Sequence, residues 1–203
     1  MEDKRAKILD VAVEEFASHG YKVASTNRIC EVAGVSKGLI FHYFGSKEKL
    51  YTAAVTYSVD LAMEEVSMDD MPKGNFVEGA IWSTKQKLAF SHRHPAVFKL
   101  MMQSFANPPE ALAERMTAYF KEMMAVQTVF VNQMLDGLTL RADVAREDAS
   151  DVIQSLFEYI TRLVTVYLQK NPDATMEDMQ PLIDKFMQMI VIAERGMVEQ
   201  KQT

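Results

Sequence analysis

Apolar residues recur at intervals of three and four along most of the chain, and no stretch alternates between apolar and polar positions as a strand does. The first such stretch, residues 4–18, predicts a helix that Gly20 closes in a left-handed conformation. The eight glycines and six prolines fall almost entirely between these stretches. The pattern therefore predicts an all-α fold of about nine helices.

Two short helices joined by a tight turn are predicted next. Ser25 or Thr26 is placed to cap a second helix that ends at Gly34, and Ser36 is placed to cap a third helix that runs through Phe44. A helix, a turn with glycine and a second short helix form a helix-turn-helix motif. In such motifs the first helix crosses the DNA backbone and the second enters the major groove.

Six further helices are predicted after the break at residues 45–46. The first of them is a long connector, which divides the chain into residues 1–46 and residues 47–203. Thr175 and Asp178 are spaced as a capping box before the last helix. The six predicted ranges are 47–66, 75–91, 95–104, 109–138, 146–169 and 176–198.

The charge of the chain is unevenly distributed. The 203 residues carry a net charge of −6, which by itself disfavours a polyanionic partner. Residues 1–50, however, hold eight Lys or Arg against seven Asp or Glu, so this part has a net charge of +1 and the remainder −7. The acidity therefore lies outside the helix-turn-helix and does not exclude DNA.

Cys30 is the single cysteine, so no intramolecular disulfide can form, and no Cys or His cluster suggests a metal site or a cofactor. The N-terminus lacks the pattern of a signal peptide, and no apolar run approaches the ~18 residues of a membrane span. We expect a cytoplasmic protein in which Cys30 is a small buried apolar residue.

Short polar and basic side chains surround both helices of the motif. Backbone N–H groups at a helix N-terminus favour a phosphate oxygen, and glycine allows the backbone to approach closely. The expected DNA-facing residues are Ser25, Thr26 and Asn27 at the second helix, Ser36, Lys37 and Gly38 at the third, and His42, Tyr43 and Lys47 around them.

Residues 34–50, GVSKGLIFHYFGSKEKL, resemble the signature of the TetR family of transcriptional regulators, and the upstream segment 16–21, FASHGY, is similar to the family as well. The resemblance covers about residues 5–50. It implies phosphate contacts by Thr26 and Lys47, a base contact by Asn27, groove contacts by Lys37, Gly38 and Leu39, and backbone contacts by Phe41 and Tyr43.

Two positions depart from the family signature. Leu39 replaces the common Thr and Phe41 the common Tyr, so each lacks a hydroxyl that could bond DNA. Contact between Leu39 and a thymine methyl is a hypothesis that follows from this change.

The last two predicted helices have apolar faces wider than the stripe that a helix needs to bury one side. The resemblance implies a homodimer in which these faces form a two-fold four-helix bundle, while additional packing within one subunit is the alternative. The candidate interface residues are Val152, Ile153, Leu156, Ile160, Leu163, Met179, Leu182, Ile183, Phe186 and Ile190.

The middle helices are rich in methionine and aromatic residues. Such a stripe is usually core, but the resemblance implies an inducer cavity here, and methionine adapts to varied ligands. Gln127 interrupts the stripe, and a buried amide needs a hydrogen-bond partner, which a ligand, water or another residue could supply. The candidate pocket residues are Trp82, Phe98, Met101, Met102, Phe105, Met116, Phe120, Met123, Gln127, Phe130 and Met134.

Together these features predict a ligand-responsive, sequence-specific DNA-binding regulator, a dimeric repressor released from a palindromic operator by an apolar or amphipathic small molecule. A helical-bundle enzyme is the main alternative, although no catalytic triad, phosphate-binding loop or diagnostic carboxylate pair is found. A lipid-binding bundle that retains the motif is the other. The sequence leaves open the operator, the inducer, the regulated genes and the choice between repression and activation.

Overall fold

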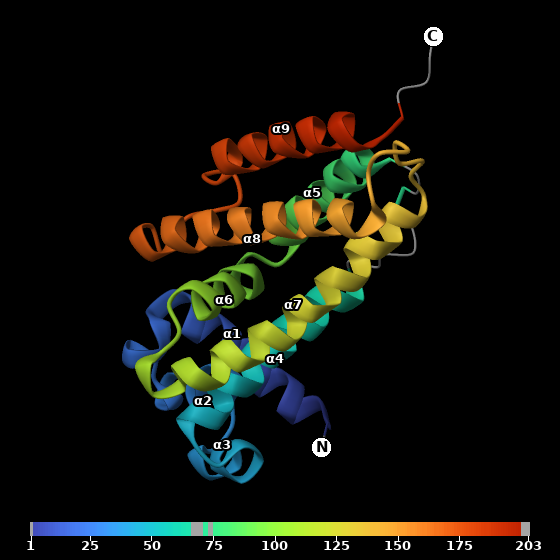
Figure 1. The fold of residues 1–203 in the computed structure, drawn as a ribbon. Coiled ribbons are helices and arrows are strands. Elements are labelled where there is room, and N and C mark those ends of the chain that lie inside the picture. The colour runs from blue at the N-terminus through green and yellow to red at the C-terminus, as the bar shows by residue number, and fades with distance from the viewer. Residues whose placement is uncertain (1, 66–70, 73–74, 200–203) are drawn as a thin grey trace. The chain divides into compact units, whose positions relative to one another are not determined.

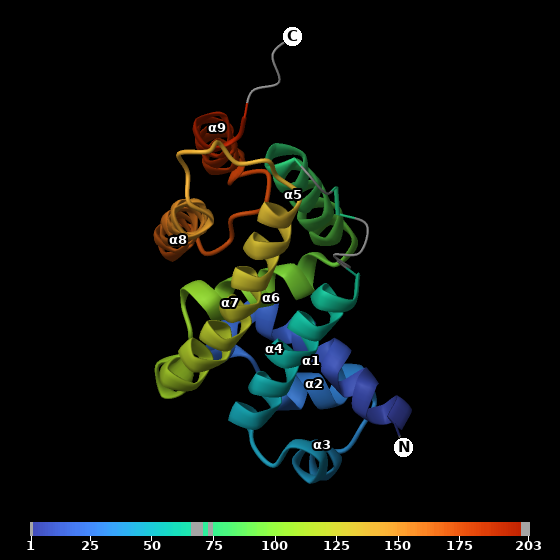
Figure 2. The same cartoon turned by 45° about the vertical axis from the view of Figure 1, so that its right-hand side comes forward.

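The computed structural model describes residues 2–65, 71–72 and 75–199, and the side chains of residues 2–3 and 122–130 lie outside this description. The described residues form helices, together with one isolated β-bridge between Leu140 and Val198 (Figures 1 and 2). The predicted all-α fold is confirmed. The elements are α1 (Glu2–Val23), α2 (Thr26–Ala33), α3 (Lys37–Phe44), α4 (Lys47–Glu65), α5 (Phe76–Arg93), α6 (Pro95–Ala106), the 3₁₀ helix η1 (Glu110–Leu112), α7 (Ala113–Asp136), α8 (Arg146–Lys170) and α9 (Gln180–Met197).

The chain forms two compact units. Unit 1 comprises residues Met1–Ser67 and Phe90–Met116, and unit 2 comprises residues Met68–Ala89 and Thr117–Thr203. Helices α5 and α7 contribute residues to both units. The predicted boundary at residue 46 falls inside unit 1, because α4 and α6 both pack against α1.

Helix α1 is the centre of unit 1, where it contacts α2, α4 and α6. Its stripe of Ile8, Ala12 and Phe16 is fully buried, as the helical spacing predicts. The Phe16 ring meets the edge of the Tyr51 ring from α4 at a centroid distance of 5.0 Å. This contact joins the first helix to the connector helix.

Unit 2 has a separate core formed by α5, α7, α8 and α9. Phe76, Val131, Ile153 and Ile190 are almost completely buried and belong to one apolar cluster. The Glu194 carboxylate of α9 accepts the Val77 backbone N–H at 2.8 Å, so α9 supplies a cap for the first turn of α5. Apolar packing and this cap hold α5 against the C-terminal helix.

Helix α9 begins later than the sequence pattern predicts. The expected capping box forms, since the Thr175 N–H donates to Asp178 Oδ2 at 2.8 Å and the Asp178 N–H donates to Thr175 Oγ1 at 3.3 Å. It encloses a turn at 176–179, and the α-helix starts only at Gln180. Pro181 explains the difference, because it has no N–H to donate to Glu177 and suits only the first turn of a helix.

The predicted helix at 109–138 is also modified. The range 109–138 begins with the 3₁₀ turn η1 and continues as α7 to Asp136. Among the described residues, no helix combines the length and the apolar character needed to cross a membrane.

Candidate nucleic-acid interface

The helix-turn-helix of unit 1 consists of α2 and α3, joined by a turn at Gly34 and Val35. Gly34 has the left-handed conformation, with φ 67° and ψ 38°, as predicted. Its N–H donates to the Glu31 carbonyl at 3.2 Å, while the Val35 N–H donates to the Cys30 carbonyl at 3.0 Å. These bonds form a Schellman motif, which ends α2 and directs the chain into α3.

Serine residues cap the three helices of this segment. Ser25, Ser36 and Ser46 begin α2, α3 and α4, and each Oγ accepts the backbone N–H three residues further on, at 3.4, 3.3 and 3.2 Å. The predicted cap of α3 is confirmed, and Ser25, not Thr26, is the cap of α2. These caps fix the starts of α2 and α3, where DNA contacts are expected.

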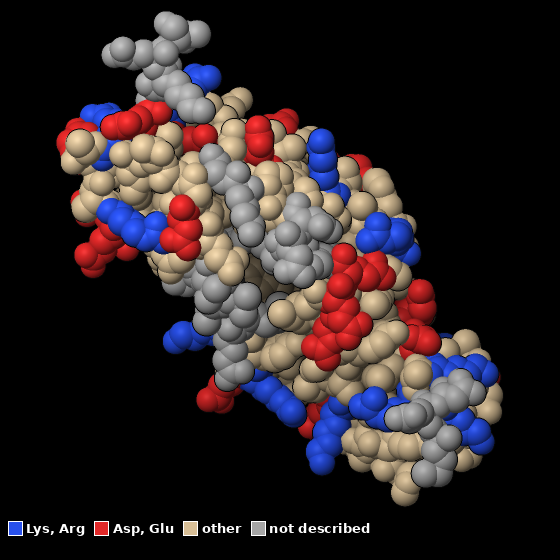
Figure 3. Space-filling view, turned by 90° about the vertical axis from the view of Figure 1, so that its right-hand side faces the viewer, with Lys and Arg blue, Asp and Glu red and all other residues tan. Residues whose placement is uncertain are grey.

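The N-terminal end of α3 is open to solvent, and its inner face is not. Ile40 and Phe44 are buried in unit 1, whereas Phe41 on the other side has 40% of its surface exposed. The Lys37 Nζ lies 6.0 Å from the centroid of the Phe41 ring. On the face drawn in Figure 3, Lys and Arg side chains gather at the lower end, which α1–α3 occupy.

The predicted DNA contacts fall into two groups by exposure. The exposed residues are Asn27, Ser36, Lys37, Gly38, Phe41 and His42, and the half-buried residues are Ser25, Thr26, Leu39, Tyr43 and Lys47. Of the predicted contacts, the structure therefore brings those at the start of α3 and Asn27 of α2 to the surface.

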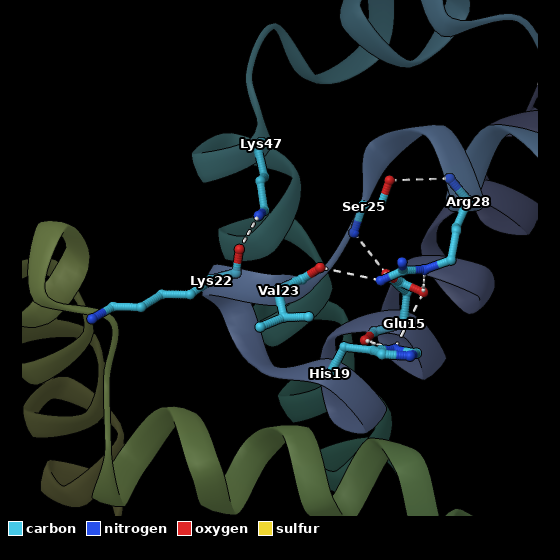
Figure 4. Close-up of polar contacts among 7 residues, drawn as sticks. All are labelled: Glu15, His19, Lys22, Val23, Ser25, Arg28 and Lys47. Atoms are coloured by element: carbon cyan, nitrogen blue, oxygen red, sulfur yellow. Dashed lines mark hydrogen bonds and ion pairs between the residues drawn. The ribbon is translucent and has the colours of Figure 1, made fainter.

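Glu15 of α1 is the centre of a polar cluster at the start of α2 (Figure 4). This carboxylate is buried, and it accepts the Ser25 backbone N–H at 2.6 Å. Arg28 of α2 donates from Nε at 3.0 and 3.1 Å and from Nη2 at 2.6 Å to the same carboxylate. Burial acts to raise the pKa of Glu15, but the hydrogen bonds from Arg28 and Ser25 outweigh it and hold that pKa below its usual range.

The C-terminal end of α1 is distorted at Gly20, which has φ 66° and ψ 167°. The positive φ agrees with the predicted left-handed closure, but the ψ value is extended, and one more turn runs to Val23. Two backbone carbonyls of that turn accept hydrogen bonds from cationic side chains. The Lys22 carbonyl accepts a bond from Lys47 Nζ at 3.3 Å, and the Val23 carbonyl accepts one from Arg28 Nη2 at 3.1 Å. Cations of α2 and α4 therefore satisfy helix-end carbonyls of α1.

Lys47, which the resemblance implies as a phosphate contact, has partners within unit 1. Besides the Lys22 carbonyl, its Nζ lies 4.9 Å from the centroid of the Tyr21 ring. Burial lowers the pKa of Lys47. A phosphate contact by this residue remains a prediction, and the bond to α1 is its observed role.

Sequence reasoning did not identify Glu15, Lys22 and Arg28 as parts of this site. One signal was present, because Glu15 lies at helical spacing on the buried stripe of α1, next to Phe16. A carboxylate on such a stripe needs hydrogen-bond partners. The partner itself could not be predicted, since Arg28 is brought to it only by the turn after α1.

The candidate pocket residues are divided between the two units. Phe98 and Met116 are buried in unit 1, and Met134 is buried in the core of unit 2, where a Cβ added at Gly79 would lie 2.6 Å from its Cε. Phe120 is also buried, while Trp82, Met101, Met102 and Phe105 are half-buried. Met123, Gln127 and Phe130 have side chains outside the described residues. Met134 therefore has an observed role in the core.

Two surface grooves, one in each unit, lie elsewhere. The groove of unit 1, about 470 Å³, runs along α4 and includes Arg5, Lys49 and Arg115 in its lining. The groove of unit 2, about 360 Å³, lies beside α9 and includes Glu194 and Arg195. Neither groove is lined by a candidate pocket residue. Among the described residues, no group of three or more metal-ligating side chains is found.

The candidate interface residues also fall into two groups. Ile153, Met179 and Ile190 are buried inside the subunit, so they offer no surface to a partner. Ile153 and Ile190 belong to the apolar cluster that α8 and α9 share with α5 and α7. Val152 has 45% of its surface exposed. The half-buried candidates are Leu156, Ile160, Leu163, Leu182, Ile183 and Phe186.

Several curated relatives are transcriptional regulators. The HTH-type transcriptional repressor AcnR of Corynebacterium efficiens is 43% identical over 65 residues, which cover 32% of this chain and 35% of the relative. The repressor SCO4008 of Streptomyces coelicolor is 32% identical over 133 residues, 62% of this chain and 64% of the relative. The chain thus spans about a third of the length of AcnR.

Solved structures share the fold along nearly the whole chain. A TetR-like regulator from Rhodococcus sp. RHA1 has a TM-score of 0.65 at 16% identity, covering 95% of this chain and 96% of the other. A TetR family regulator from Chloroflexus aurantiacus has a TM-score of 0.57 at 24% identity, covering 98% and 95%.

Two family models match, one over each part of the chain. The model of bacterial regulatory proteins of the tetR family matches residues 8–54, which contain the whole helix-turn-helix. The model of the tetracyclin repressor-like C-terminal domain matches residues 79–198, more than half of the chain. The chain therefore belongs to the TetR family of bacterial regulatory proteins.

Proposed function

We propose that this chain is a sequence-specific DNA-binding transcriptional regulator that acts as a dimeric repressor in the cytoplasm. The observation that carries the proposal is the α2–α3 motif, in which both helices are capped and the start of α3 is exposed. Asn27, Lys37 and His42 are exposed there, and α3 is buried on its inner side by Ile40 and Phe44. A short helix fixed in this way suits insertion into the major groove.

Within this proposal, the residues of the motif have different tasks. The Ser36 cap leaves the first turn of α3 directed to the outside, where Lys37 supplies a cation and Gly38 has no side chain to hinder the backbone. Asn27 is the exposed polar side chain of α2 suited to a base edge. Lys47 supports the end of α1 by its observed bonds.

Dimerisation follows from the size of the motif and from the faces of α8 and α9. One helix reads only a few base pairs, so two motifs about 34–36 Å apart are needed to read a palindrome. In the proposed dimer, exposed and half-buried apolar side chains of α8 and α9 would meet their copies across a two-fold axis.

An apolar or amphipathic small molecule is the proposed release signal. It would bind among the middle helices and prefer the conformation with low operator affinity, and a tenfold loss of affinity needs about 1.4 kcal/mol of that preference. Unchanged operator affinity in the presence of a bound ligand would remove the release signal from the proposal.

The proposed function can be tested by selecting bound duplexes from a random DNA library and measuring the affinity of the enriched sequence. We expect a palindrome whose binding weakens with salt and is reduced by Lys37→Ala. Lys170→Ala, which removes an exposed lysine at the end of α8, is the matched control and should leave the affinity unchanged. Absence of any enriched sequence would favour the lipid-binding or enzyme alternatives.

A further inference from the structure

Arg28 has the position expected of a DNA contact. It lies on the first turn of α2, directly after Thr26 and Asn27, and its side chain is 45% exposed. An arginine at such a place is commonly a phosphate ligand, because its planar group forms two parallel hydrogen bonds. Its observed partners, however, are inside the protein.

The guanidinium group is directed at the end of α1 (Figure 4). Nε and Nη2 both donate to the Glu15 carboxylate, and Nη2 also donates to the Val23 carbonyl. The same carboxylate accepts the Ser25 N–H, which belongs to the cap residue of α2. The buried Glu15 carboxylate thus binds both the backbone N–H of the cap residue and the guanidinium group of Arg28.

This cluster fixes α2 at its N-terminus. Glu15 is only 8% exposed, so it is kept in position by the packing of α1, and the bonds that it accepts from Ser25 and Arg28 determine where α2 begins. The Schellman motif at Gly34 then connects α2 rigidly to α3. A shift at Ser25 is therefore transmitted to the recognition helix.

We propose that Glu15 and Arg28 are positioning residues of the DNA-reading motif, and that Arg28 acts through Glu15 and not through a phosphate. This inference rests on the proposed function. It differs from a phosphate-binding role in one measurable respect, because only a cation that neutralises a phosphate releases counterions from DNA.

The test is the slope of log affinity against log salt concentration, measured with the selected palindrome for the wild type, Lys37→Ala, Arg28→Gln and Glu15→Gln. Lys37→Ala should reduce the slope by about 0.9 for each phosphate that the lysine no longer neutralises. Arg28→Gln and Glu15→Gln should each weaken binding by about tenfold with the slope unchanged, since hydrogen bonds to charged groups contribute on this order.

The double variant Glu15→Gln/Arg28→Gln should bind no more weakly than either single variant, because both act through one interaction. Circular dichroism and thermal unfolding ensure that binding is measured on folded protein. Arg28→Lys provides a second variant, which keeps the charge but not the two-pronged geometry, and its slope should equal that of the wild type while its affinity falls.

A reduced slope for Arg28→Gln, with Arg28→Lys restoring both slope and affinity, would overturn the inference and make Arg28 a phosphate contact. The same result would leave the proposed function intact. Failure of the proposed function would be recognised separately, because the wild type would then show no palindrome to bind and Lys37→Ala would have no effect.

Discussion

The two units of the molecule differ in where their exposed apolar side chains lie. In unit 1, α1 is covered on several sides, and large side chains such as Phe16 and Leu50 have no exposed surface. In unit 2, Val152 and Val166 of α8 and Ile192 of α9 remain 45%, 45% and 71% exposed. The exposed large apolar residues described in unit 1 are instead spread over four helices, with one each on α1, α2, α3 and α4. Most of the exposed large apolar residues of unit 2 thus lie on the two helices α8 and α9, which suits the proposed contact with a second copy.

The two units also differ in how polar groups position their helices. Unit 1 fixes the short helices α2 and α3 by a serine cap each and by the Glu15 cluster, because helices of eight residues bury too little surface to be positioned by packing alone. Unit 2 relies on longer helices, α8 with 25 residues and α9 with 18. Precise placement is therefore concentrated where DNA reading is proposed.

The largest effect is expected from the core of unit 1. Phe16→Ala removes a fully buried ring that contacts Tyr51, and it should lower the free energy of unfolding by about 3–5 kcal/mol. Val23→Ala, on the same helix but 67% exposed, is the control and should change it little. Denaturant unfolding measures both, and equal effects would contradict a self-sufficient core in unit 1.

The second prediction concerns the proposed dimer interface of unit 2. Val152→Glu places like charges near each other across a two-fold interface and should convert the dimer to a monomer, which sedimentation would detect, at a cost of several kcal/mol. Val23→Glu puts the same charge on an exposed apolar position of unit 1 and should leave the assembly unchanged. A dimer that persists in Val152→Glu would show that this part of α8 is not the interface.

The third prediction uses the lowered pKa of Glu15. A carboxyl with a depressed pKa in the folded state stabilises the fold above its unfolded pKa, and this contribution is lost as the pH falls through the folded value. Wild type should therefore melt higher than Glu15→Gln at pH 7, and the difference should shrink below pH ~4. A difference that is constant with pH would mean that the charge of Glu15 does not stabilise unit 1.

The smallest effect is expected at the helix caps. Ser46→Ala removes the cap of α4 and should destabilise the protein by about 1 kcal/mol. Thr175→Ala should lower the free energy of unfolding by less, because the capping box of Thr175 encloses a turn and not the start of α9. Thermal unfolding of the two variants tests whether unit 1 depends more on its caps than unit 2 does.

Local chemistry made much of the fold predictable. The bounds of α2 and α3 follow from a serine at each start and a glycine at the end of α2, since these residues act within one turn of the helix. The start of α9 was misplaced by four residues, because the apolar pattern continues through the turn that Pro181 imposes. The spacing of apolar residues indicates which side chains face inward, but it does not indicate at which residue the helix begins.

The candidate site was less predictable than the fold. Exposure of Lys37 and burial of Ile40 follow from their places in the motif. The pairing of Arg28 with Glu15 depends on a turn between two helices, and the assignment of Met134 to the core depends on the absence of a side chain at Gly79. Contacts between distant residues of this kind are set by packing, which one sequence does not disclose.

The most direct test of the central claim is the dependence of binding on the spacing of two half-sites. Affinity for the selected palindrome should fall sharply when about 5 base pairs, half a helical turn, are inserted at its centre. Insertion of a full turn keeps both half-sites on the same side of the DNA and should lower the affinity less. Affinity that is insensitive both to the base sequence and to this insertion would contradict a dimer that reads DNA through two α3 helices.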